Sequence, residues 1–451
     1  MSEVSYDRRE LLKESISIAW PAVLESFFVA LAGMIDTLMV SSLGTYAVAA
    51  VGLTVQPKYI CLSVFFAINV AVSALVARRR GQDDSKGANR VLVTAVVLSV
   101  LVCALISVLS VALADPIIRL CGSAADTHTP AVEYFTVIQG GMIFNVLTML
   151  INAAQRGAGN TLIAMQTNVV SSLVNICFNY LLIGGNFGFP ALGLYGAAIA
   201  TVLGTAVSAI MAIISLLRKN GYLSLGRIVK EKIAPSVEVL KSIYHLAGNL
   251  LVENVAMRVG FMATSIMAAR LGTDAFAAHQ VGMNFLSLGF SFGDGMQAAA
   301  VALIGRSLGE QKPDKAKVYG SICQHVGLAL SIALGLVCLI FGRDLFRIFF
   351  SADDVLAMGV IIMRYTSVIV LFQISQVIYS GCLRGAGDVR YCLYVALISV
   401  TLIRTIVTWL LTGVFSFGLH GIWTGVLSDQ LSRLILLRIR FAQGNWTKIR
   451  I

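Results

Sequence analysis

Apolar segments long enough to cross a lipid bilayer recur along the whole 451-residue chain. A helix needs about 20 mainly apolar residues to span the hydrocarbon core, where unpaired backbone groups find no water. The apolar positions form continuous runs and do not alternate with polar ones, so the segments predict helices and not barrel strands. Twelve spanning helices are expected, at residues 15–40, 53–77, 91–113, 132–153, 161–184, 193–217, 243–269, 281–305, 319–341, 358–381, 390–413 and 419–440.

Composition agrees with a membrane protein. Hydrophobic residues make up 57% of the chain and charged residues only 13%, whereas soluble proteins carry about 25% charged residues. The formal net charge is +11, but lysine and arginine in the loops of a membrane protein set its topology, so no nucleic-acid partner is expected. The eight cysteines are scattered without a CxxC pair, so neither a disulfide framework nor a metal site is predicted. We predict an all-α integral membrane protein without a cofactor.

Basic residues gather in alternate loops. Lysines and arginines cluster near the N-terminus and in segments 78–90, 218–241, 306–317 and 438–450. If the helices alternate across the membrane, all these clusters lie on one side, and the positive-inside rule makes that side cytoplasmic. The first apolar run is long enough to span and is expected to stay in the mature protein. We therefore expect a multi-pass protein of the cell inner (plasma) membrane, a monomer in the lipid bilayer with both termini in the cytoplasm.

The chain repeats itself at a fixed interval. LGTYAVAA at 43–50 matches LGTDAFAA at 271–278, and RGAGN at 156–160 matches RGAGD at 384–388; both pairs are separated by the same distance along the chain, which we call the repeat offset. Six helices per repeat is an even number, so the two repeats should share one orientation in the membrane. The expected domains are a six-helix lobe at 1–217, a cytoplasmic linker at 218–242 and a second six-helix lobe at 243–451. The linker is either a helix on the inner membrane surface or a plain connector.

Several motifs together resemble a known transporter family. Pro21-x-x-x-Glu25 precedes Asp36-Thr37 in the first predicted helix, RGAG turns follow the fourth and tenth helices, and AAHQ occurs at 277–280. With twelve helices in two parallel repeats, the chain resembles the multidrug and toxic compound extrusion (MATE) transporters over essentially its whole length. The resemblance implies two lobes facing each other across a cleft and export of organic compounds.

Two positions point to a branch of that family. Members similar to NorM carry a carboxylate in the tenth helix, where this chain has Gln373. Members similar to DinF carry an Asn-x-x-x-Asp pair in the fifth helix, where this chain has Asn175-x-x-x-Asn179. The chain looks closer to the DinF-like branch, but the second acid is missing, which leaves Asp36 as the acid expected to act.

Asp36 lies within the apolar run of the first helix, where a carboxylate is costly and faces the bundle interior or a water-filled cavity. Removal from water favours the neutral form of a carboxyl group, which can take up a proton on one side of the membrane and release it on the other. The resemblance aligns Asp36 with the family's first-helix acid, whose protonation competes with substrate or reshapes that helix. Sodium coupling and a purely structural hydrogen bond to Asn175 or Asn179 are the alternatives.

Other polar side chains in predicted helices are candidates for the cleft. Asn175 and Asn179 share a helix face, where they either hold helices together or coordinate ion and substrate. Glu25 and its repeat mate Glu253 lie at matched depth and either line the inner mouth of the cleft or pair structurally with a cation such as Arg258. Arg258 in the cleft favours anionic or zwitterionic substrates. The cleft candidates are Glu25, Tyr134, Glu253, Arg258, Gln280 and Gln373.

These features predict a secondary active antiporter. It would export organic, amphipathic or cationic compounds, with a H⁺ or Na⁺ gradient driving alternating access. A flippase for lipid-linked saccharides, of related architecture, is the alternative. A membrane enzyme is disfavoured because the five histidines are dispersed and no HExxH or GxSxG motif occurs. No GxxxxGK[ST] loop occurs either, which argues against an ATP-driven pump.

Overall fold

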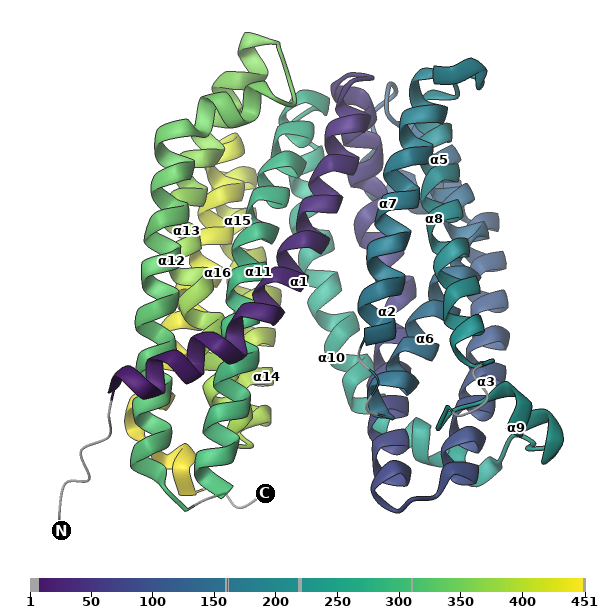
Figure 1. The fold of residues 1–451 in the computed structure, drawn as a ribbon. Helices are drawn as coiled ribbons and strands as arrows, with labels where there is room; N and C mark the ends of the chain where they lie inside the picture. Colours follow the sequence, from purple (N-terminus) through teal and green to yellow (C-terminus); the bar gives the residue numbers. More distant parts are fainter. Residues whose placement is uncertain (1–7, 159, 161, 218–220, 310, 449–451) are drawn as a thin grey trace. The chain divides into compact units, whose positions relative to one another are not determined.

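The structure is a computed structural model that describes residues 8–158, 160, 162–217, 221–309 and 311–448; the side chains of a few residues within these ranges, among them Pro21, Glu25 and Glu253, are outside the description (Figure 1). The described chain forms sixteen α-helices: α1 Arg8–Ser41, α2 Thr45–Gly81, α3 Ser85–Ala112, α4 Ala114–Leu120, α5 His128–Gly140, α6 Met142–Gly157, α7 Leu162–Gly184, α8 Gly193–Ser215, α9 Leu225–Lys230, α10 Val237–Ala269, α11 Thr273–Gly309, α12 Pro313–Arg347, α13 Asp353–Gly385, α14 Val389–Leu397, α15 Thr405–Trp409 and α16 Gly418–Gln443. Two 3₁₀ turns, η1 Asn186–Gly188 and η4 Asn445–Lys448, and two π-helical segments, η2 Ile398–Arg404 and η3 Leu410–Val414, complete it.

The helices account for the twelve predicted spans. Eight helical segments of the described residues are long and apolar enough to cross a membrane, and α5 with α6 forms a ninth, bent by 46°. The apolar stretches 26–41 of α1 and 257–269 of α10, together with α16, complete the twelve. The predicted all-α membrane fold is therefore confirmed. The fourth predicted helix, 132–153, forms two helices, because the backbone hydrogen bonds of the helix are interrupted at the glycine pair Gly140 and Gly141.

The backbone reproduces the sequence repeat. Gly44 between α1 and α2 has φ +113°, and Gly272 between α10 and α11 has φ +107°. The turns that follow α2 and α11 contain Asp83 at φ +53° and Gln311 at φ +58°, again separated by the repeat offset. Residues that carry a side chain rarely adopt this left-handed backbone conformation. Both repeats therefore contain the same unusual turn at the same position.

The paired RGAG motifs hold two helices at close range. A Cβ atom at Gly157, the last residue of α6, would lie against the carbonyl oxygen of Ser73 in α2. A Cβ atom at Gly385, the last residue of α13, would lie 2.7 Å from the carbonyl oxygen of Val301 in α11. The two glycines are separated by the repeat offset, and so are the two carbonyl groups. The motif is therefore a packing device in which glycine lets one helix end approach a neighbouring backbone.

The helices form two compact units. We call residues 35–266 the N-unit and residues 1–34 with 267–451 the C-unit. α1 belongs to both, since its first part runs obliquely beside α12 of the C-unit in Figure 1, where Tyr319 donates a 2.5 Å hydrogen bond to Glu14. The predicted boundaries, 1–217 and 243–451, follow the sequence repeat and not the contacts, and they stay a prediction.

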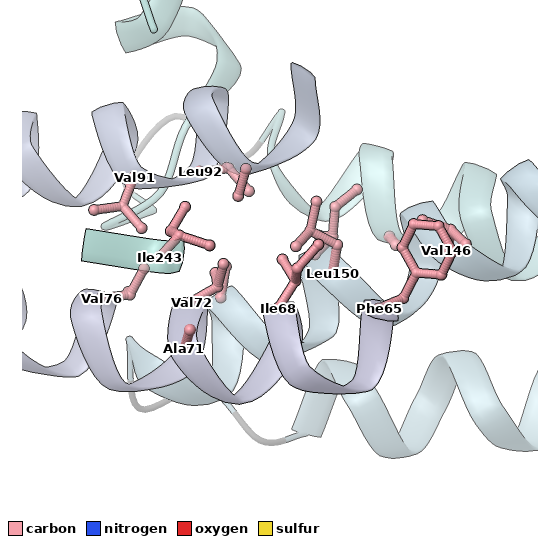
Figure 2. Close-up of a cluster of buried hydrophobic side chains, with 14 of the residues drawn as sticks. Phe65, Ile68, Ala71, Val72, Val76, Val91, Leu92, Val146, Leu150 and Ile243 are labelled. Atoms are coloured by element: carbon pink, nitrogen blue, oxygen red, sulfur yellow. The ribbon is translucent and has the colours of Figure 1, made fainter. Parts of the chain in front are cut away.

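The core of the N-unit is built from small and branched apolar side chains. Figure 2 shows Phe65, Val72, Leu92, Leu150 and Ile243 pointing into one cluster from α2, α3, α6 and α10. All five are at most 2% exposed. Since lipid tails are themselves apolar, such helices are held by close packing and by polar contacts more than by the hydrophobic effect.

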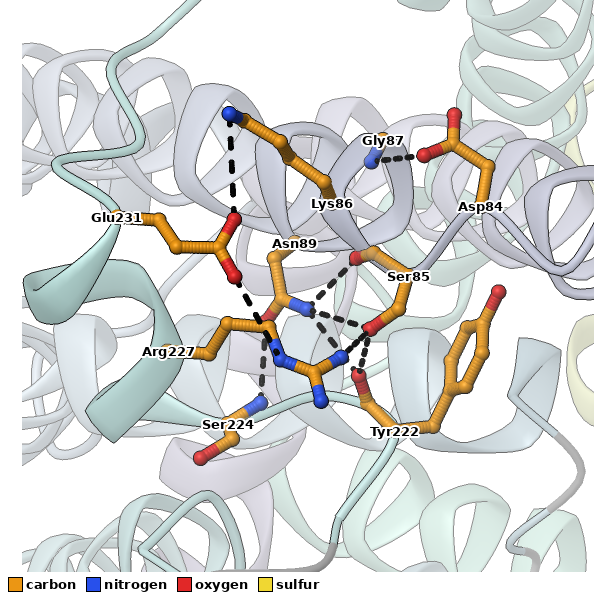
Figure 3. Close-up of polar contacts among 9 residues, drawn as sticks. All are labelled: Asp84, Ser85, Lys86, Gly87, Asn89, Tyr222, Ser224, Arg227 and Glu231. Carbon is orange, nitrogen blue, oxygen red and sulfur yellow. Dashed lines mark hydrogen bonds and ion pairs between the residues drawn. The ribbon is translucent and has the colours of Figure 1, made fainter.

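The segment between the repeats is tied to the N-unit. Ser85 Oγ and Asn89 Nδ2, near the start of α3, both donate to the carbonyl oxygen of Tyr222, and Asn89 Oδ1 accepts from Ser224 N (Figure 3). Farther along, Glu231 lies 4.0 Å from Lys86. α9 is only six residues long. The described part of this segment is therefore a connector hydrogen-bonded to α3.

A buried charge cluster marks the C-unit. Asp429 of α16 is fully buried and accepts from Arg433 at 2.7 Å, while Arg404 of η2 lies 3.7 Å away and is 3% exposed. A π-helical segment often marks a functional or strained site because it disturbs the regular backbone ladder. One carboxylate thus compensates two arginines inside the bundle.

We expect Gly157→Ala and Gly385→Ala each to lower the free energy of unfolding by about 1–3 kcal/mol, because the added methyl group has to push a neighbouring backbone away. Thermal unfolding of the purified protein in detergent measures the effect. Gly248→Ala in α10 is the control, since its Cβ would meet no atom within 4 Å. Equal stability of all three variants would contradict the close approach.

We expect Asp429→Asn to destabilise the C-unit by about 3–5 kcal/mol, because it removes the buried carboxylate that pairs with Arg433 and with the buried Arg404. Asp353→Asn is a matched control: Asp353 lies 3.7 Å from Arg343, the same distance as Asp429 from Arg404, but Asp353 and Arg343 are both exposed. The control should lose about 0–1 kcal/mol. Similar losses of folded protein on heating for both variants would show that burial does not decide the outcome.

Candidate functional site

Asp36 lies near the C-terminal end of α1, in the part of that helix that belongs to the N-unit. Its side chain is half-buried and meets α7. Asn179 of α7 is fully buried and donates from Nδ2 to Asp36 Oδ1 at 2.5 Å. A hydrogen bond to a charged acceptor is about twice as strong as a neutral one, so this contact holds α1 against α7 while Asp36 is ionised.

The hydrogen bonds continue from Asp36 into α8. Asn179 Nδ2 also lies 3.2 Å from Asn175 Oδ1, one turn earlier in α7. Asn175 Nδ2 donates to Thr201 Oγ1 at 3.0 Å, and Thr201 Oγ1 donates to the carbonyl oxygen of Ala197. The structure thus brings together the predicted residues Asp36, Asn175 and Asn179 in one chain of hydrogen bonds, which we call the Asp36 network.

The amide groups of this network can serve either protonation state of Asp36. Exchanging the nitrogen and oxygen of the Asn175 amide places its nitrogen 3.1 Å from Asp36 Oδ1, and its oxygen then accepts from the backbone and the hydroxyl of Thr201. An asparagine presents a donor or an acceptor depending on this orientation. An ionised Asp36 needs donors, whereas a protonated Asp36 can donate to an amide oxygen. Asn179 Oδ1, buried and without a hydrogen-bond partner, is such an acceptor.

Tyr134 and Lys58 complete the surroundings of Asp36. Tyr134 of α5 is 5% exposed, and its hydroxyl interacts with Thr201 and with the charge of Asp36. Lys58 of α2 lies near enough to interact with the same carboxylate. The expected cleft residue Tyr134 is therefore a neighbour of the acid, and a lysine lies within electrostatic reach of it.

Oxygen ligands for a hard cation also meet here. A carboxylate, two amide oxygens and a hydroxyl suit Na⁺ as well as a proton. Among the described residues, no group of three or more His, Cys, Asp or Glu side chains gathers in a way that could hold a transition metal.

The other predicted residues lie elsewhere. Gln373 of α13 is fully buried in the C-unit and donates to the carbonyl oxygen of Leu286 in α11 at 3.2 Å, so it joins two helices. Gln280 is half-buried in α11 of the same unit. The side chains of Glu25 and Glu253 lie outside the described residues, and their roles stay predictions.

Arg258 of α10 has a partner that the sequence did not suggest. Its guanidinium lies 4.4 Å from the ring centre of Tyr59 and 5.9 Å from that of Phe261. Lys58 approaches the same Tyr59 ring at 5.4 Å. Cation–π contacts therefore hold Arg258. The alternative of a pair with Glu253 involves a side chain outside the described residues and stays a prediction.

A cavity of about 920 Å³ opens within the N-unit, between α2, α6, α7, α8 and α10. Such a volume matches a site for a drug-sized molecule. Its described lining comprises two arginines, five asparagines, five serines or threonines and three apolar residues. Arg258 contributes to the lining, as does Asn168, which lies two turns before Asn175 on α7.

Sequence reasoning missed most of this lining and the C-unit charge cluster. Asn69, Asn145 and Asn152 of the cavity wall fall in predicted spanning helices, as do Arg404 and Asp429. A polar amide or a charge inside an apolar span is itself the signal that finds such residues. What the sequence did not show is which of these helices face one another.

Comparisons with known proteins agree with this architecture. The MatE family model matches residues 21–181 and again residues 250–410, one match in each repeat. The chain is 28% identical over 444 residues to a "Probable multidrug resistance protein NorM" of Thermotoga maritima, covering 97% of this chain and 94% of that protein. It is 26% identical over 435 residues to the "Uncharacterized transporter YisQ" of Bacillus subtilis, covering 95% and 94%.

A solved structure shares the fold. A multidrug resistance MATE family transporter of the MOP superfamily, in an inward-facing conformation, superposes with a TM-score of 0.84 at 22% identity, covering 92% of this chain and 95% of that chain. The expected DinF-like branch stays a prediction, since the relative from Thermotoga maritima carries the NorM name. Because the family model covers more than half of the chain, in both repeats, the chain belongs to the MatE family of multidrug and toxic compound extrusion transporters.

Proposed function

We propose that this protein is a secondary active antiporter that exports organic compounds through alternating access, driven by the entry of protons. The observation that carries the proposal is the Asp36 network, an acid held between helices by amides that can serve both of its protonation states. The family membership and the printed names of the relatives, which describe probable multidrug resistance proteins, support it.

The position of Asp36 suggests how a proton could act on the fold. α1 passes from the C-unit to the N-unit between Met34 and Ile35, so Asp36 is the second residue beyond this point. Gly33, just before it, is a position where an added Cβ would meet no atom within 4 Å. Protonation neutralises the Asp36 carboxylate, which accepts the hydrogen bond from Asn179. The hydrogen bond becomes weaker, and so does the contact between α1 and α7. A change at this acid therefore acts on the helix that both units share.

The remaining parts of the proposal follow from topology and family. The protein resides in the plasma membrane with both termini in the cytoplasm, because its basic residues cluster in alternate loops. It works as a monomer on small organic substrates and without a catalytic step. Protons are the proposed coupling ion, and Na⁺ is the alternative that the oxygen ligands around Asp36 allow.

A flippase for lipid-linked saccharides is the second candidate function. The N-unit cavity favours the flippase function. Its two arginines and many amides and hydroxyls suit a phosphate with sugar hydroxyls better than a hydrophobic cation. In this function the same two-unit fold would move an amphiphile between leaflets. Transport of a soluble dye by the reconstituted protein separates the two functions.

We expect Asp36→Asn to reduce proton-driven efflux at least about tenfold, because an amide can neither bind nor release a proton at this site. The measurement follows dye loss from proteoliposomes under an imposed proton gradient, and then under a sodium gradient. Asp353→Asn, an exposed acid of the C-unit, is the control and should transport as the unaltered protein does. Unchanged efflux by Asp36→Asn under a proton gradient would refute the coupling role.

A further inference from the structure

The N-unit cavity carries an excess of positive charge. Arg156 and Arg258 line it, and no carboxylate occurs among its described lining residues. Neither arginine forms an ion pair with a carboxylate of the described residues. A half-buried guanidinium without a nearby carboxylate leaves positive potential in the cavity, because water screens it only in part.

The partners of Arg258 leave its N–H donors for a ligand. Its guanidinium carbon lies 4.4 Å from the centre of the Tyr59 ring, and this cation–π contact holds the group without accepting a hydrogen bond along its edge. The N–H donors point outward in the plane of the group, and their forked arrangement matches a carboxylate or a phosphate. The cation–π contacts thus position Arg258 without neutralising its charge.

Polar groups around the arginines suit the rest of such a ligand. Asn152 of α6 is 3% exposed and donates from Nδ2 to Thr167 at 2.8 Å, while its Oδ1 is buried without a hydrogen-bond partner. A buried acceptor without a donor is costly, and a ligand hydroxyl or N–H group would supply that donor. Phe66, Val70 and Met149 provide the apolar part of the wall.

We propose that this cavity selects organic compounds that carry an anionic group, a carboxylate or a phosphate, together with hydroxyl or N–H donors. The proposal rests on the proposed transport function and specifies its substrate class. Arg258 binds the anionic group, Arg156 attracts it, and the Asn152 carbonyl oxygen accepts from a neighbouring donor. A cationic compound would face two arginines with no carboxylate among the described lining residues to offset them, so it would bind this cavity more weakly.

Two dyes of one scaffold and opposite charge test the proposal. Binding of anionic fluorescein and of cationic rhodamine 123 to the purified full-length protein is measured by fluorescence anisotropy in detergent, without any gradient. The unaltered protein should bind fluorescein more tightly. Arg258→Gln should weaken fluorescein binding about tenfold or more, the loss expected for a charge-assisted hydrogen bond, and should not weaken rhodamine 123 binding.

Matched variants keep the result interpretable. Arg258→Lys keeps the charge and should retain part of the fluorescein affinity, and Arg343→Gln, an exposed arginine of the C-unit, should retain all of it. Where Arg258→Gln does not fold, Arg156→Gln on the exposed side of the cavity replaces it. Tighter binding of rhodamine 123 to the unaltered protein, or equal fluorescein affinity of the cavity variants and Arg343→Gln, would overturn the proposal.

Competition identifies the source of the anionic group. Glucose 6-phosphate represents a soluble ligand, and dioctanoyl phosphatidylglycerol represents a lipid headgroup; displacement of fluorescein by either one supports the proposal and indicates that source. Displacement by neither contradicts it. Because the binding measurement needs no gradient, a negative binding result is distinct from a failure of transport. If the protein exports rhodamine 123 under a proton gradient but does not bind fluorescein, the proposed transport function stands and the proposed substrate class is wrong.

Discussion

A polar or charged group inside a helical membrane bundle has to find its partner within the protein, because the surrounding lipid offers none. Three such groups organise this structure. Asp36 is held by Asn179 of α7, Asp429 by two arginines of α16 and η2, and Arg258 by the ring of Tyr59. The first two are compensated by hydrogen bonds or opposite charge. Among the described residues, Arg258 is compensated by aromatic rings and by no carboxylate, which is why its cavity is the place where a ligand of opposite charge fits.

The two repeats share a backbone and differ in chemistry. The turns with positive φ and the close glycine contacts recur at the repeat offset, so the scaffold was kept in both. The repeat mate of Asp36 is Thr264, which is fully buried and bonds to its own helix at the carbonyl oxygen of Gly260. The C-unit instead carries a fully buried acid, Asp429, in α16. A membrane helix tolerates few charged residues. The two repeats therefore share one backbone scaffold, and each carries its own small set of buried polar residues.

The site itself was only partly predictable. Asp36, Asn175 and Asn179 could be named from the sequence because a carboxylate and paired amides stand out in apolar runs. Gln373 stood out for the same reason, yet it joins α13 to α11 by a hydrogen bond to a backbone carbonyl. A polar residue in a span thus signals that a partner exists, and the signal is the same for a coupling group and for a structural one. The N-unit cavity was not foreseen, because its lining comes from five helices, and the sequence does not show which faces of these helices meet.

The sequence by itself determined the class of fold, the number of spans, the parallel repeat and the acid of the first helix. These depend on local properties: run length, periodicity, loop charge and a single carboxylate in an apolar segment. The tertiary structure decided which polar groups meet. In the tertiary structure, α1 belongs to two units, the fourth span is interrupted at a glycine pair, and Arg258 lies against Tyr59. Such pairings depend on helix rotation and packing between segments far apart in the chain, which hydrophobic periodicity alone does not specify.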